Sequence, residues 1–517
     1  MSSDIAMVSD DLRRQAKDQP DAIVFDYLGR ETSYKELDHY ASQVAQGLLA
    51  AGMKPASRLG FLGKNTDLYF HILCGAQKIR AAMVGINARL APPEVAFVLN
   101  DAGCEILFVG KDFYPVIEKI LPDCPQLKTV IAIDGEHGDW QDFAAWRDQY
   151  EAEDPMLPHE ADDTVIQLYT SGTTGHPKGV ELTNSNFSDM YDQASKAWAV
   201  WGRGDVILLA MPLFHIAGVN VGLVAIHYGC TAIMTRDVDP GEILSLIESK
   251  KIKYMFLVPA VILFLMQHPD IDKTDLSSVR EILYGASPIA EELLVSAQKR
   301  FQCDFRQVYG LTETTGCATT LPPEAHKGKL LRSCGRPNKG IDLRVVDENG
   351  KACDVGKVGE IVMRATTNMK GYWNRPDETK EAMRGGYFHT GDAGYFDEDG
   401  WLYIYDRVKD MIVSGGENVY PAEVENALFA HPSVADVAVI GVPDEKWGEA
   451  VKAVIVVKPD AQLTGEELIG WAREKIADYK LPKSVDMVEA LPRNPSGKIL
   501  RRELRDPYWK GRTRRVS

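Results

Sequence analysis

The sequence predicts an α/β protein, with a large N-terminal domain of parallel and mixed sheets flanked by helices and a small α+β C-terminal domain. Short apolar runs alternate with helical segments from Arg58 to Tyr284, a pattern typical of β-α-β units. After about residue 335, strands with glycine-rich turns take over, and we expect a β-barrel-like subdomain there. Near residue 410 a new small unit of helices and strands begins. A chain of 517 residues is too long for one compact core, which supports the division into domains.

The helix that the pattern defines best follows Ser33. Ser33–Glu36 (SYKE) has the order of a capping box, in which both side chains satisfy free backbone N–H groups at a helix start. Apolar residues then recur at helical spacing up to Leu49, and Gly52 stands where a C-terminal cap belongs. In the C-terminal unit, helices are predicted over Ala422–Phe429 and Thr464–Ile476.

Strands are predicted where a short apolar run is bounded by turn residues. In chain order these runs are Arg58–Leu62, Met83–Ile86, Ile106–Val109, Thr129–Ile133, Val165–Tyr169, Val206–Leu209, Thr231–Met234, Tyr254–Val258, Glu281–Tyr284, Leu343–Val346, Glu360–Arg364, Val437–Ile440 and Val451–Val457. Residues 206–228 contain no Asp, Glu, Lys or Arg, which raises a membrane span, but a proline, an asparagine and two histidines interrupt them. We expect a buried strand followed by a buried helix, and no integral membrane segment.

The bulk composition argues against several kinds of partner. A formal net charge of −16 disfavours a general nucleic-acid binder, which needs basic surface. The 8 cysteines are scattered and form no Cys-x-x-Cys pair, which predicts reduced thiols rather than disulfides or zinc ligands. The N-terminus lacks the apolar stretch of a secretory signal. We therefore expect a cytoplasmic protein.

The strongest local signal is Tyr169–Val180 (YTSGTTGHPKGV), where a predicted strand runs into a loop of glycines and small hydroxyl residues. Glycines allow close backbone approach, and clustered N–H and O–H donors suit phosphate oxygens. Lys178 adds a mobile positive charge. The spacing is not that of a Walker loop, because no Ser or Thr follows a Gly-Lys pair. A Gly/Ser loop alone is usually just a turn, but this length and order favour phosphate binding.

Further motifs follow in a fixed order: Gln307–Glu313 (QVYGLTE), Tyr387–Asp392 (YFHTGD), Asp406–Asp410 (DRVKD) and Pro492–Lys498 (PRNPSGK). Together with the loop they resemble the adenylate-forming superfamily, which includes acyl-CoA synthetases, aryl-CoA ligases, luciferases and peptide-synthetase adenylation domains. The resemblance covers nearly the whole chain. Ser414–Pro421 (SGGENVYP) and Pro443–Glu449 (PDEKWGE) look most like bacterial fatty-acyl- and aryl-CoA ligases.

The resemblance implies an ATP site, with Mg²⁺ and coenzyme A as further requirements. The triphosphate would be held by Thr170, Ser171, Gly172, Thr173, Thr174, Gly175 and Lys178. Glu313 and Thr170 would ligate Mg²⁺, since a hard cation prefers oxygen ligands. The remaining nucleotide contacts would come from Gly285, Ala286, Ser287, Gln307, Val308, Tyr309, Gly310, Thr312, Asp392, Ile404 and Arg407. Among them Tyr309 would pack on adenine, Thr312 would bind phosphate and Asp392 would accept the ribose hydroxyls.

The resemblance also implies two half-reactions. Lys498 would stabilise the α-phosphate during adenylation of a carboxylic acid, and His215 would stand at the mouth of the acyl pocket. The C-terminal domain, residues 407–517, would then rotate against residues 1–406 about a hinge at Lys409, where other members have Asp. Gly415, Gly416 and Trp447 would line the coenzyme A channel.

Taken singly, these residues also have purely structural explanations. An isolated His215 in an apolar run is more often a satisfied core histidine, and Asp392 after a glycine is usually a turn residue. Two alternative functions stay open: an adenylating enzyme that loads a carrier protein, and a nucleotide-binding protein without catalysis. For the acid, medium to long fatty acids come first and aryl or aryl-alkanoic acids second, since Gly218, Val219 and Gly222 indicate room for a chain or ring. The family resemblance also suggests a homodimer.

Overall fold

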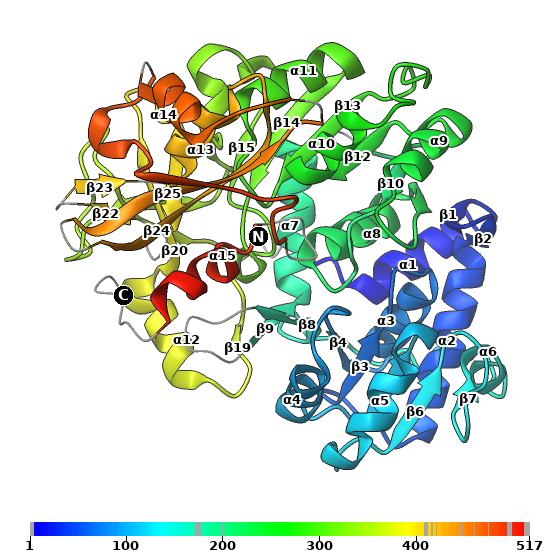
Figure 1. The fold of residues 1–517 in the computed structure, drawn as a ribbon. Coiled ribbons are helices and arrows are strands. Elements are labelled where there is room, and N and C mark those ends of the chain that lie inside the picture. The colour runs from blue at the N-terminus through cyan, green and yellow to red at the C-terminus, as the bar shows by residue number, and fades with distance from the viewer. Residues whose placement is uncertain are drawn as a thin grey trace.

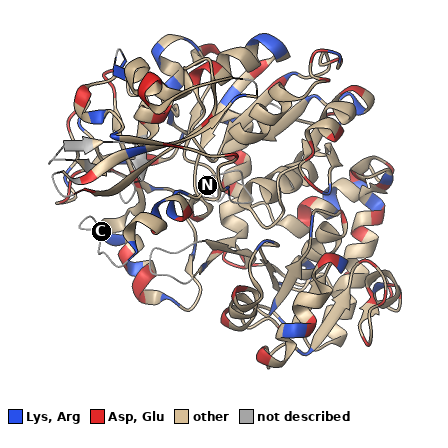
Figure 2. Cartoon of the chain, viewed as in Figure 1, with Lys and Arg blue, Asp and Glu red and all other residues tan. Residues whose placement is uncertain are grey.

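The structure is a computed structural model of the chain (Figure 1). It describes residues 5–170, 177–198, 201–407, 412–414, 417–419, 421–444, 447–459, 461–473, 475–493 and 499–510. Among these residues no helix is long and apolar enough to cross a bilayer. Lysine and arginine are interspersed with aspartate and glutamate over the elements, as Figure 2 shows.

The central sheet has the strand order β16-β15-β14-β13-β12-β10-β11-β1-β2 within the described residues. Its strands are β1 (Ile23–Tyr27), β2 (Arg30–Ser33), β10 (Val206–Leu209), β11 (Thr231–Met234), β12 (Tyr254–Leu257), β13 (Glu281–Gly285), β14 (Asp304–Tyr309), β15 (Thr319–Leu321) and β16 (Arg336–Pro337). From β1 to β14 across the sheet, neighbours run parallel, and the edges at β2, β15 and β16 are antiparallel. One face is covered by α9 (Pro240–Lys250), α10 (Pro259–Gln267) and α11 (Glu291–Phe301), and the other by α8 (Ile216–Tyr228).

The N-terminal sheet has the order β19-β9-β8-β4-β3-β5-β6-β7. Its strands are β3 (Arg58–Leu62), β4 (Ala82–Gly85), β5 (Ile106–Val109), β6 (Thr129–Ala132), β7 (Gln141–Asp142), β8 (Thr164–Thr170), β9 (Lys178–Thr183) and β19 (Gly371–Tyr372). Helices α2 (Tyr34–Ala50), α3 (Leu68–Lys78) and α6 (Phe143–Arg147) pack on one face, and α4 (Pro92–Ala102) and α5 (Tyr114–Ile120) on the other. Both large sheets are therefore mixed and covered by helices on both faces, which agrees with the predicted parallel and mixed sheets flanked by helices.

The glycine-rich region forms a small antiparallel sheet of β17 (Asp342–Val346), β18 (Gly359–Arg364), β20 (Phe388–Phe396) and β21 (Leu402–Arg407). The C-terminal sheet follows, with the order β23-β22-β25-β24 and β26 beside β25. Its strands are β22 (Ile412–Ser414), β23 (Glu417–Val419), β24 (Val434–Asp444), β25 (Gly448–Val457) and β26 (Ser484–Met487). Helices α13 (Pro421–Phe429) and α14 (Gly465–Arg473) cover one face, and α15 (Arg501–Trp509) covers the other.

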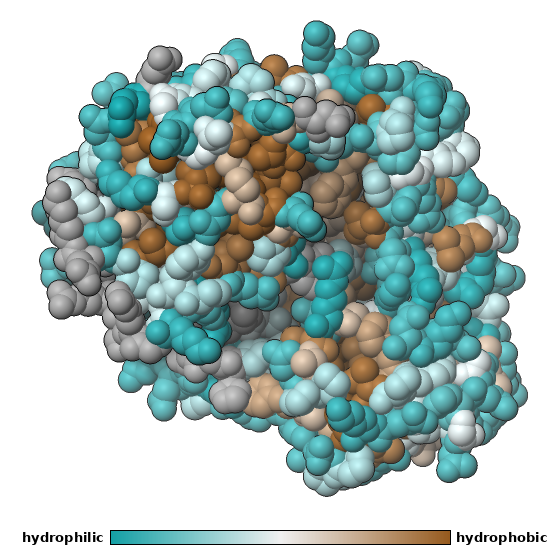
Figure 3. Space-filling view, in the orientation of Figure 1, coloured by the Kyte–Doolittle hydropathy of each residue, from teal (hydrophilic) through white to brown (hydrophobic). Residues whose placement is uncertain are grey.

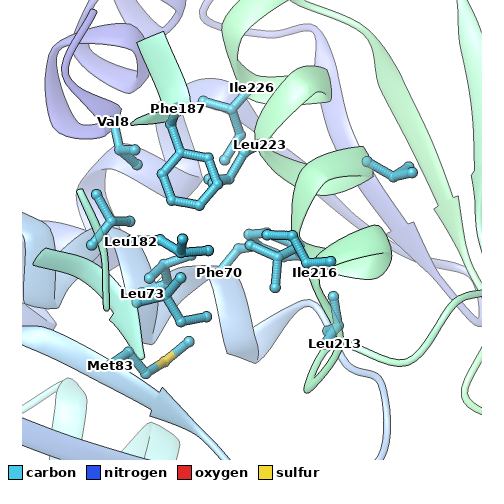
Figure 4. Close-up of a cluster of buried hydrophobic side chains, with 14 of the residues drawn as sticks. Val8, Phe70, Leu73, Met83, Leu182, Phe187, Leu213, Ile216, Leu223 and Ile226 are labelled. Carbon is cyan, nitrogen blue, oxygen red and sulfur yellow. The ribbon is translucent and has the colours of Figure 1, made fainter. Parts of the chain in front are cut away.

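One hydrophobic core joins the two large sheets. It runs between α1 (Val8–Asp18), α3, α7 (Asn184–Ala197) and α8, where Phe70, Phe187, Leu213, Ile216 and Leu223 pack together (Figure 4). Because α8 takes part in this core on one side, only its opposite face remains for a ligand. The remaining helix of this large unit is α12 (Pro376–Ala382) beside β19.

Most of the predicted elements recur with small shifts at their ends, whereas β24 extends well beyond the predicted Val437–Ile440. The capping box at Ser33 is present, with both hydrogen bonds formed, and Gly52 has φ +84° just beyond the helix end. The apolar segment from residue 206 splits into β10 and α8, as predicted. All 8 cysteines are free thiols, so the predicted absence of disulfides is confirmed. The domain boundary at residue 406 stays a prediction.

Candidate functional site

One cavity of about 1860 Å³ lies where the three sheets of the large unit meet, under the C-terminal unit. Most of the predicted site residues in the described ranges line it: Thr170, Lys178, His215, Ala286, Ser287, Gln307, Val308, Tyr309, Gly310, Thr312, Glu313, Asp392 and Ile404. On the face drawn in Figure 3, apolar side chains show in the recess between the C-terminal unit and the central sheet. Residues far apart in sequence thus converge on one space, as the motifs require.

The carboxyl edge of the central sheet forms one wall. Strands β13 and β14 are parallel with Gly285 opposite Val308, so both end at this edge, where open α/β sheets usually bind ligands. Gly285 does not line the cavity itself; a Cβ there would stand 2.2 Å from the Val308 carbonyl oxygen, so only glycine fits. The next residue, Ala286, has φ +65°, a conformation that side chains rarely adopt. The turn that follows β13 is therefore strained and faces the cavity.

The loop of residues 310–316 presents Glu313 to the cavity and is held from several sides. Gly310 packs against the far side of the loop, where an added Cβ would lie 2.3 Å from backbone. Asn220 of α8 donates from Nδ2 to the Thr315 carbonyl oxygen at 2.9 Å. The Glu313 carbonyl oxygen accepts from the Met369 N–H at 2.8 Å. The carboxylate of a side chain that is only 9% exposed is thereby fixed in direction.

A hairpin of the N-terminal sheet brings a hydroxyl and a cation to this carboxylate. Thr170 ends β8 directly opposite Lys178 at the start of β9. The Thr170 hydroxyl donates to Glu313 Oε1 at 3.4 Å, and the Tyr372 hydroxyl donates to the same oxygen at 3.0 Å. The Lys178 Nζ stands 5.1 Å from the centre of the Tyr372 ring. Oxygen donors and one ammonium group therefore share a small space, a set suited to a phosphate chain with a hard cation.

A second carboxylate faces the cavity from the small antiparallel sheet. Tyr309 and Asp392 are 8% and 7% exposed, and the Tyr309 hydroxyl donates to Asp392 Oδ2 at 2.8 Å. Burial, and then the nearby Asp392 carboxylate, raise the pKa of Tyr309 well above its usual value. The phenol therefore stays protonated and donates at neutral pH. In the β20–β21 pair the backbone of Arg407 lies opposite Asp392, and Ile404 of β21 lines the cavity.

Helix α8 forms the wall on the side where the resemblance predicts the acyl pocket. His215 is the residue before its first turn, and Ala217, Asn220, Val221 and Val224 line the cavity at helical spacing. Opposite them stand Phe256, Leu283 and Val308 from β12, β13 and β14. This branch of the cavity is mostly apolar, as a site for an acyl group requires.

The expectation that Gly218, Val219 and Gly222 make room for the substrate is wrong. None of the three lines the cavity. An added Cβ at Gly218 would lie 2.4 Å from the Pro212 carbonyl oxygen, and one at Gly222 would lie 2.0 Å from the Phe70 ring. Val219 is fully buried in the core. The glycines therefore let α8 approach its neighbours closely, on the faces that point away from the cavity.

The C-terminal unit closes the cavity from above. Its contributions are Ala422, Glu423 and Asn426 of α13, Arg493, and the residues Ile499, Leu500, Arg501, Arg502, Glu503 and Arg505. Arg493 and Ile499 form an antiparallel bridge, so the chain on both sides of residues 494–498 stands at the cavity. Trp447, also in the C-terminal unit, does not line the cavity. It is 39% exposed, and the Lys483 Nζ lies 6.0 Å from the centre of its ring.

Several predicted residues lie outside the described part of the chain. They are Ser171, Gly172, Thr173, Thr174, Gly175, Lys409, Gly415, Gly416 and Lys498. For Arg407, only the backbone is described. Sequence reasoning also missed Tyr372 and Asn220. The signal for Tyr372 was a Gly-Tyr-Trp run before Pro376, too short to define a strand by pattern, and Asn220 is a polar residue within a buried apolar helix.

Comparison with known proteins agrees with this arrangement. The family model of AMP-binding enzymes matches residues 12–373, and that of the AMP-binding enzyme C-terminal domain matches residues 423–498. The chain is 40% identical to the fatty acid–acyl-carrier-protein ligase ScoC of Streptomyces coeruleorubidus, over 95% of this chain and 94% of that protein. It is 37% identical to a feruloyl-CoA synthase of an Amycolatopsis species, over 95% and 97%. The crystal structure of the anthranilate CoA ligase AuaEII with anthranoyl-AMP superposes with a TM-score of 0.91 at 26% identity, covering 98% of this chain and 97% of that one. The chain therefore belongs to the AMP-binding enzyme family.

Proposed function

We propose that the protein is an AMP-forming acid–CoA ligase, which joins a carboxylic acid to coenzyme A at the expense of ATP. The observation that supports this most is the cavity, in which Thr170, Lys178 and Glu313 lie together beside an apolar branch along α8. Phosphate-binding groups and an acyl-sized apolar wall in one space fit the transfer of AMP to an acid. The ligases among the relatives support the same activity.

In the first half-reaction a carboxylate oxygen of the acid attacks the α-phosphorus of ATP. The bond from this phosphorus to the bridging oxygen breaks, pyrophosphate leaves with that oxygen, and an acyl-adenylate results. Two anions meet in this step, so positive charge and fixed positions lower the barrier. Lys178 and Lys498 supply ammonium groups in this proposal. Asp392, oriented by the Tyr309 hydroxyl, accepts the ribose hydroxyls.

Glu313 and Thr170 fit a divalent cation. A carboxylate and a hydroxyl that already lie within 3.4 Å of each other offer the oxygen ligands that Mg²⁺ prefers. When bound, the ion neutralises charge on the phosphate oxygens. The Tyr372 hydroxyl keeps the Glu313 carboxylate turned toward the hairpin, and Asn220 and Met369 hold the loop that carries it.

In the second half-reaction the thiol sulfur of coenzyme A attacks the acyl carbon. The bond from this carbon to the AMP oxygen breaks, AMP leaves, and the thiol proton passes to solvent. We propose that residues 407–517 turn against residues 1–406 about Lys409 between the two steps, which removes Lys498 and brings Gly415, Gly416 and Trp447 to the thiol. Trp447 stands away from the cavity in the present arrangement, which fits the first step. All 8 thiols are free, which suits a reducing cytoplasm, and a homodimer is the assembly that the resemblance implies.

Acid-dependent exchange of labelled pyrophosphate into ATP tests the first step. We expect exchange with at least one acid from a panel of aliphatic and aromatic acids, and release of AMP once coenzyme A is added. A folded protein that supports no exchange with any acid would contradict the proposal. Because ScoC acts on a carrier protein, the acceptor is tested by offering free coenzyme A and a phosphopantetheinylated carrier in parallel. Faster transfer to the carrier would favour the alternative acceptor.

A further inference from the structure

The acyl branch of the cavity follows one face of α8 from its start toward its end. Ala217, Asn220, Val221 and Val224 are spaced as successive turns of one helix face. Ala217 and Val224 are seven residues apart, which at 1.5 Å per residue is about 10 Å. The opposite wall, Phe256 of β12 and Leu283 of β13, follows the strands in the same direction, away from the carboxyl edge.

Two tryptophans lie at the inner end of this branch. Trp198 directly follows α7, and Trp201 comes three residues later; both line the cavity. Trp201 is 7% exposed, and its ring centre lies 5.9 Å from that of Tyr254, which begins β12. The Ala197 carbonyl oxygen accepts from Arg306 Nη1 at 2.9 Å, near the start of β14. Trp198 and Trp201 therefore lie under the amino ends of these strands, opposite to the edge at which the adenylate forms.

Behind Trp198 lies a second cavity of about 700 Å³. Among the described residues, Trp198 alone lines both cavities. The second cavity is lined by Lys196, Arg306, Lys327, Arg336 and Lys339 and by one carboxylate, Glu324. Lys196 and Arg306 are paired with Asp192 and Glu281, so the excess positive charge comes from Lys327, Arg336 and Lys339. Trp401 and Leu330 add apolar surface. In the described structure neither Trp198 nor Trp201 donates a hydrogen bond from its indole N–H, so packing alone holds the two rings.

We propose that the acyl site ends blind at Trp198 and Trp201, and that Trp198 determines specificity by separating it from the second cavity. This inference rests on the proposed ligase function and names its substrate class. An extended chain advances roughly 1.2 Å per bond, since three bonds make a residue of about 3.6 Å. A branch of about 10 Å therefore holds about eight carbons or one substituted aromatic ring. The protein takes medium-chain or single-ring acids, and long-chain acids are excluded.

The test is a series of straight-chain acids from four to eighteen carbons, measured by pyrophosphate exchange. In the wild type we expect kcat/KM to peak near eight carbons and to fall about 100-fold by sixteen, the scale on which closed apolar pockets discriminate. Trp198→Ala joins the two cavities, and we expect this variant to use the sixteen-carbon acid about as well as the eight-carbon acid. Trp201→Ala is the matched control, because it deletes the same atoms from the same floor without opening the second cavity. It extends the accepted length by one or two carbons only.

A second comparison reports where the chain end goes. In Trp198→Ala, hexadecanedioic acid should react about tenfold faster than hexadecanoic acid, because its second carboxylate reaches the cations of the second cavity. Trp198→Phe keeps a wall and the short-chain profile, and a melting temperature close to that of the wild type shows that each variant is folded. The inference is overturned if the wild type uses sixteen carbons as well as eight, or if folded Trp198→Ala keeps the wild-type profile. Absence of exchange with every acid would instead contradict the ligase function.

Discussion

At the scale of single residues, the cluster around Glu313 explains how a loop holds a carboxylate in a fixed direction toward the cavity. Its carboxylate accepts hydrogen bonds from Thr170 and Tyr372, two residues of the N-terminal sheet, while the loop itself belongs to the central sheet. The hydrogen bonds therefore join the two sheets at the proposed metal site. Each donor is neutral, so neither hydrogen bond pairs the carboxylate with a positive charge.

We expect Tyr372→Phe to raise the Mg²⁺ concentration that half-saturates pyrophosphate exchange by about tenfold. The substitution removes one hydrogen bond to a charged group, worth about 1.5–3 kcal/mol, and keeps the ring near Lys178. Calorimetric binding of Mg·ATP gives a second readout. Tyr34→Phe is the control, since its hydroxyl donates to the carbonyls of Ala225 and Cys230, away from the cavity. An unchanged Mg²⁺ requirement in Tyr372→Phe would show that the Tyr372 hydroxyl does not position the Glu313 carboxylate for the ion.

A buried histidine gives the protein a pH-dependent stability. His71 is 2% exposed, and neither ring nitrogen has a hydrogen-bond partner in the described structure. Burial lowers the pKa of His71 to about 4 from 6.5. The folded state thus binds fewer protons than the unfolded state between these values. The stabilisation is present above pH 6.5 and is lost as the pH falls through this window.

We therefore expect the melting temperature to fall between pH 6.5 and pH 4, and His71→Phe to reduce this slope. Phenylalanine keeps the stacking on Tyr40 without a titrating group. His326, whose pKa burial also lowers to about 4, leaves a residual slope in the variant. The exposed His39→Phe should retain the full wild-type slope. If the melting temperature of His71→Phe depended on pH as that of the wild type does, protonation of His71 would not be the cause of the slope.

The residues that sequence reasoning found and missed differ in one physical respect. Thr170, Glu313 and Asp392 each belong to a motif in which glycines and hydroxyl residues stand out from the surrounding pattern. Tyr372 and Asn220 act through tertiary contacts that no local pattern records. Strand β19 has only two residues, and Asn220 stands out in the apolar α8 without any sign of its distant partner Thr315. Gly222 was misread for the same reason, since its neighbour Phe70 is distant in sequence.

At the scale of elements, α8 shows how one helix serves a core and a ligand site together. Its two buried faces leave no solvent side, and Gly222 lets it touch α3 closely. We expect Gly222→Ala to destabilise the protein by about 1–3 kcal/mol through overpacking, without changing the preferred chain length of the acid. Unfolding in urea and the acid series provide the measurements.

The control for this prediction is Gly470→Ala. Gly470 lies within α14, and an added Cβ there meets nothing within 4 Å, so alanine should be neutral or stabilising by about 0.5–1 kcal/mol. If Gly222→Ala were as stable as the wild type and shortened the accepted acids, the glycine would belong to the substrate pocket after all.

The sequence predicted which segments are helices and which are strands, but it did not always predict where each element ends. Arg58–Leu62 is β3 as predicted, because the apolar run and the buried strand coincide. Strand β24 extends to Val434–Asp444, well beyond the predicted Val437–Ile440, because its pairing with β25 continues past the apolar run. Helix α14 ends at Arg473 rather than Ile476. Strand order and the convergence of the motifs depend on long-range pairing, and only the resemblance to a family anticipated them.

At the scale of the whole molecule, the C-terminal unit is docked in a way that suits adenylation. Arg493 and Ile499, on either side of the segment that contains Lys498, line the cavity, while Trp447 stands away from it. Helix α13 packs on β21, and Phe429 contacts the hydrophobic clusters of both the C-terminal unit and the central sheet. This side chain is therefore an apolar contact between the two units.

We expect Phe429→Ala to slow adenylation about tenfold and to leave thioester formation from supplied acyl-adenylate within about twofold. The lost contact is worth about 1–2 kcal/mol, less than full burial of a phenylalanine, and it exists only while the C-terminal unit is docked as seen here. Ile476→Ala controls for damage to the C-terminal core, because Ile476 packs on that core and not on the central sheet. Single-turnover rates of each half-reaction measure the effect. An equal loss in both half-reactions would mean that this docking is common to them, and domain rotation between the steps would then be untenable.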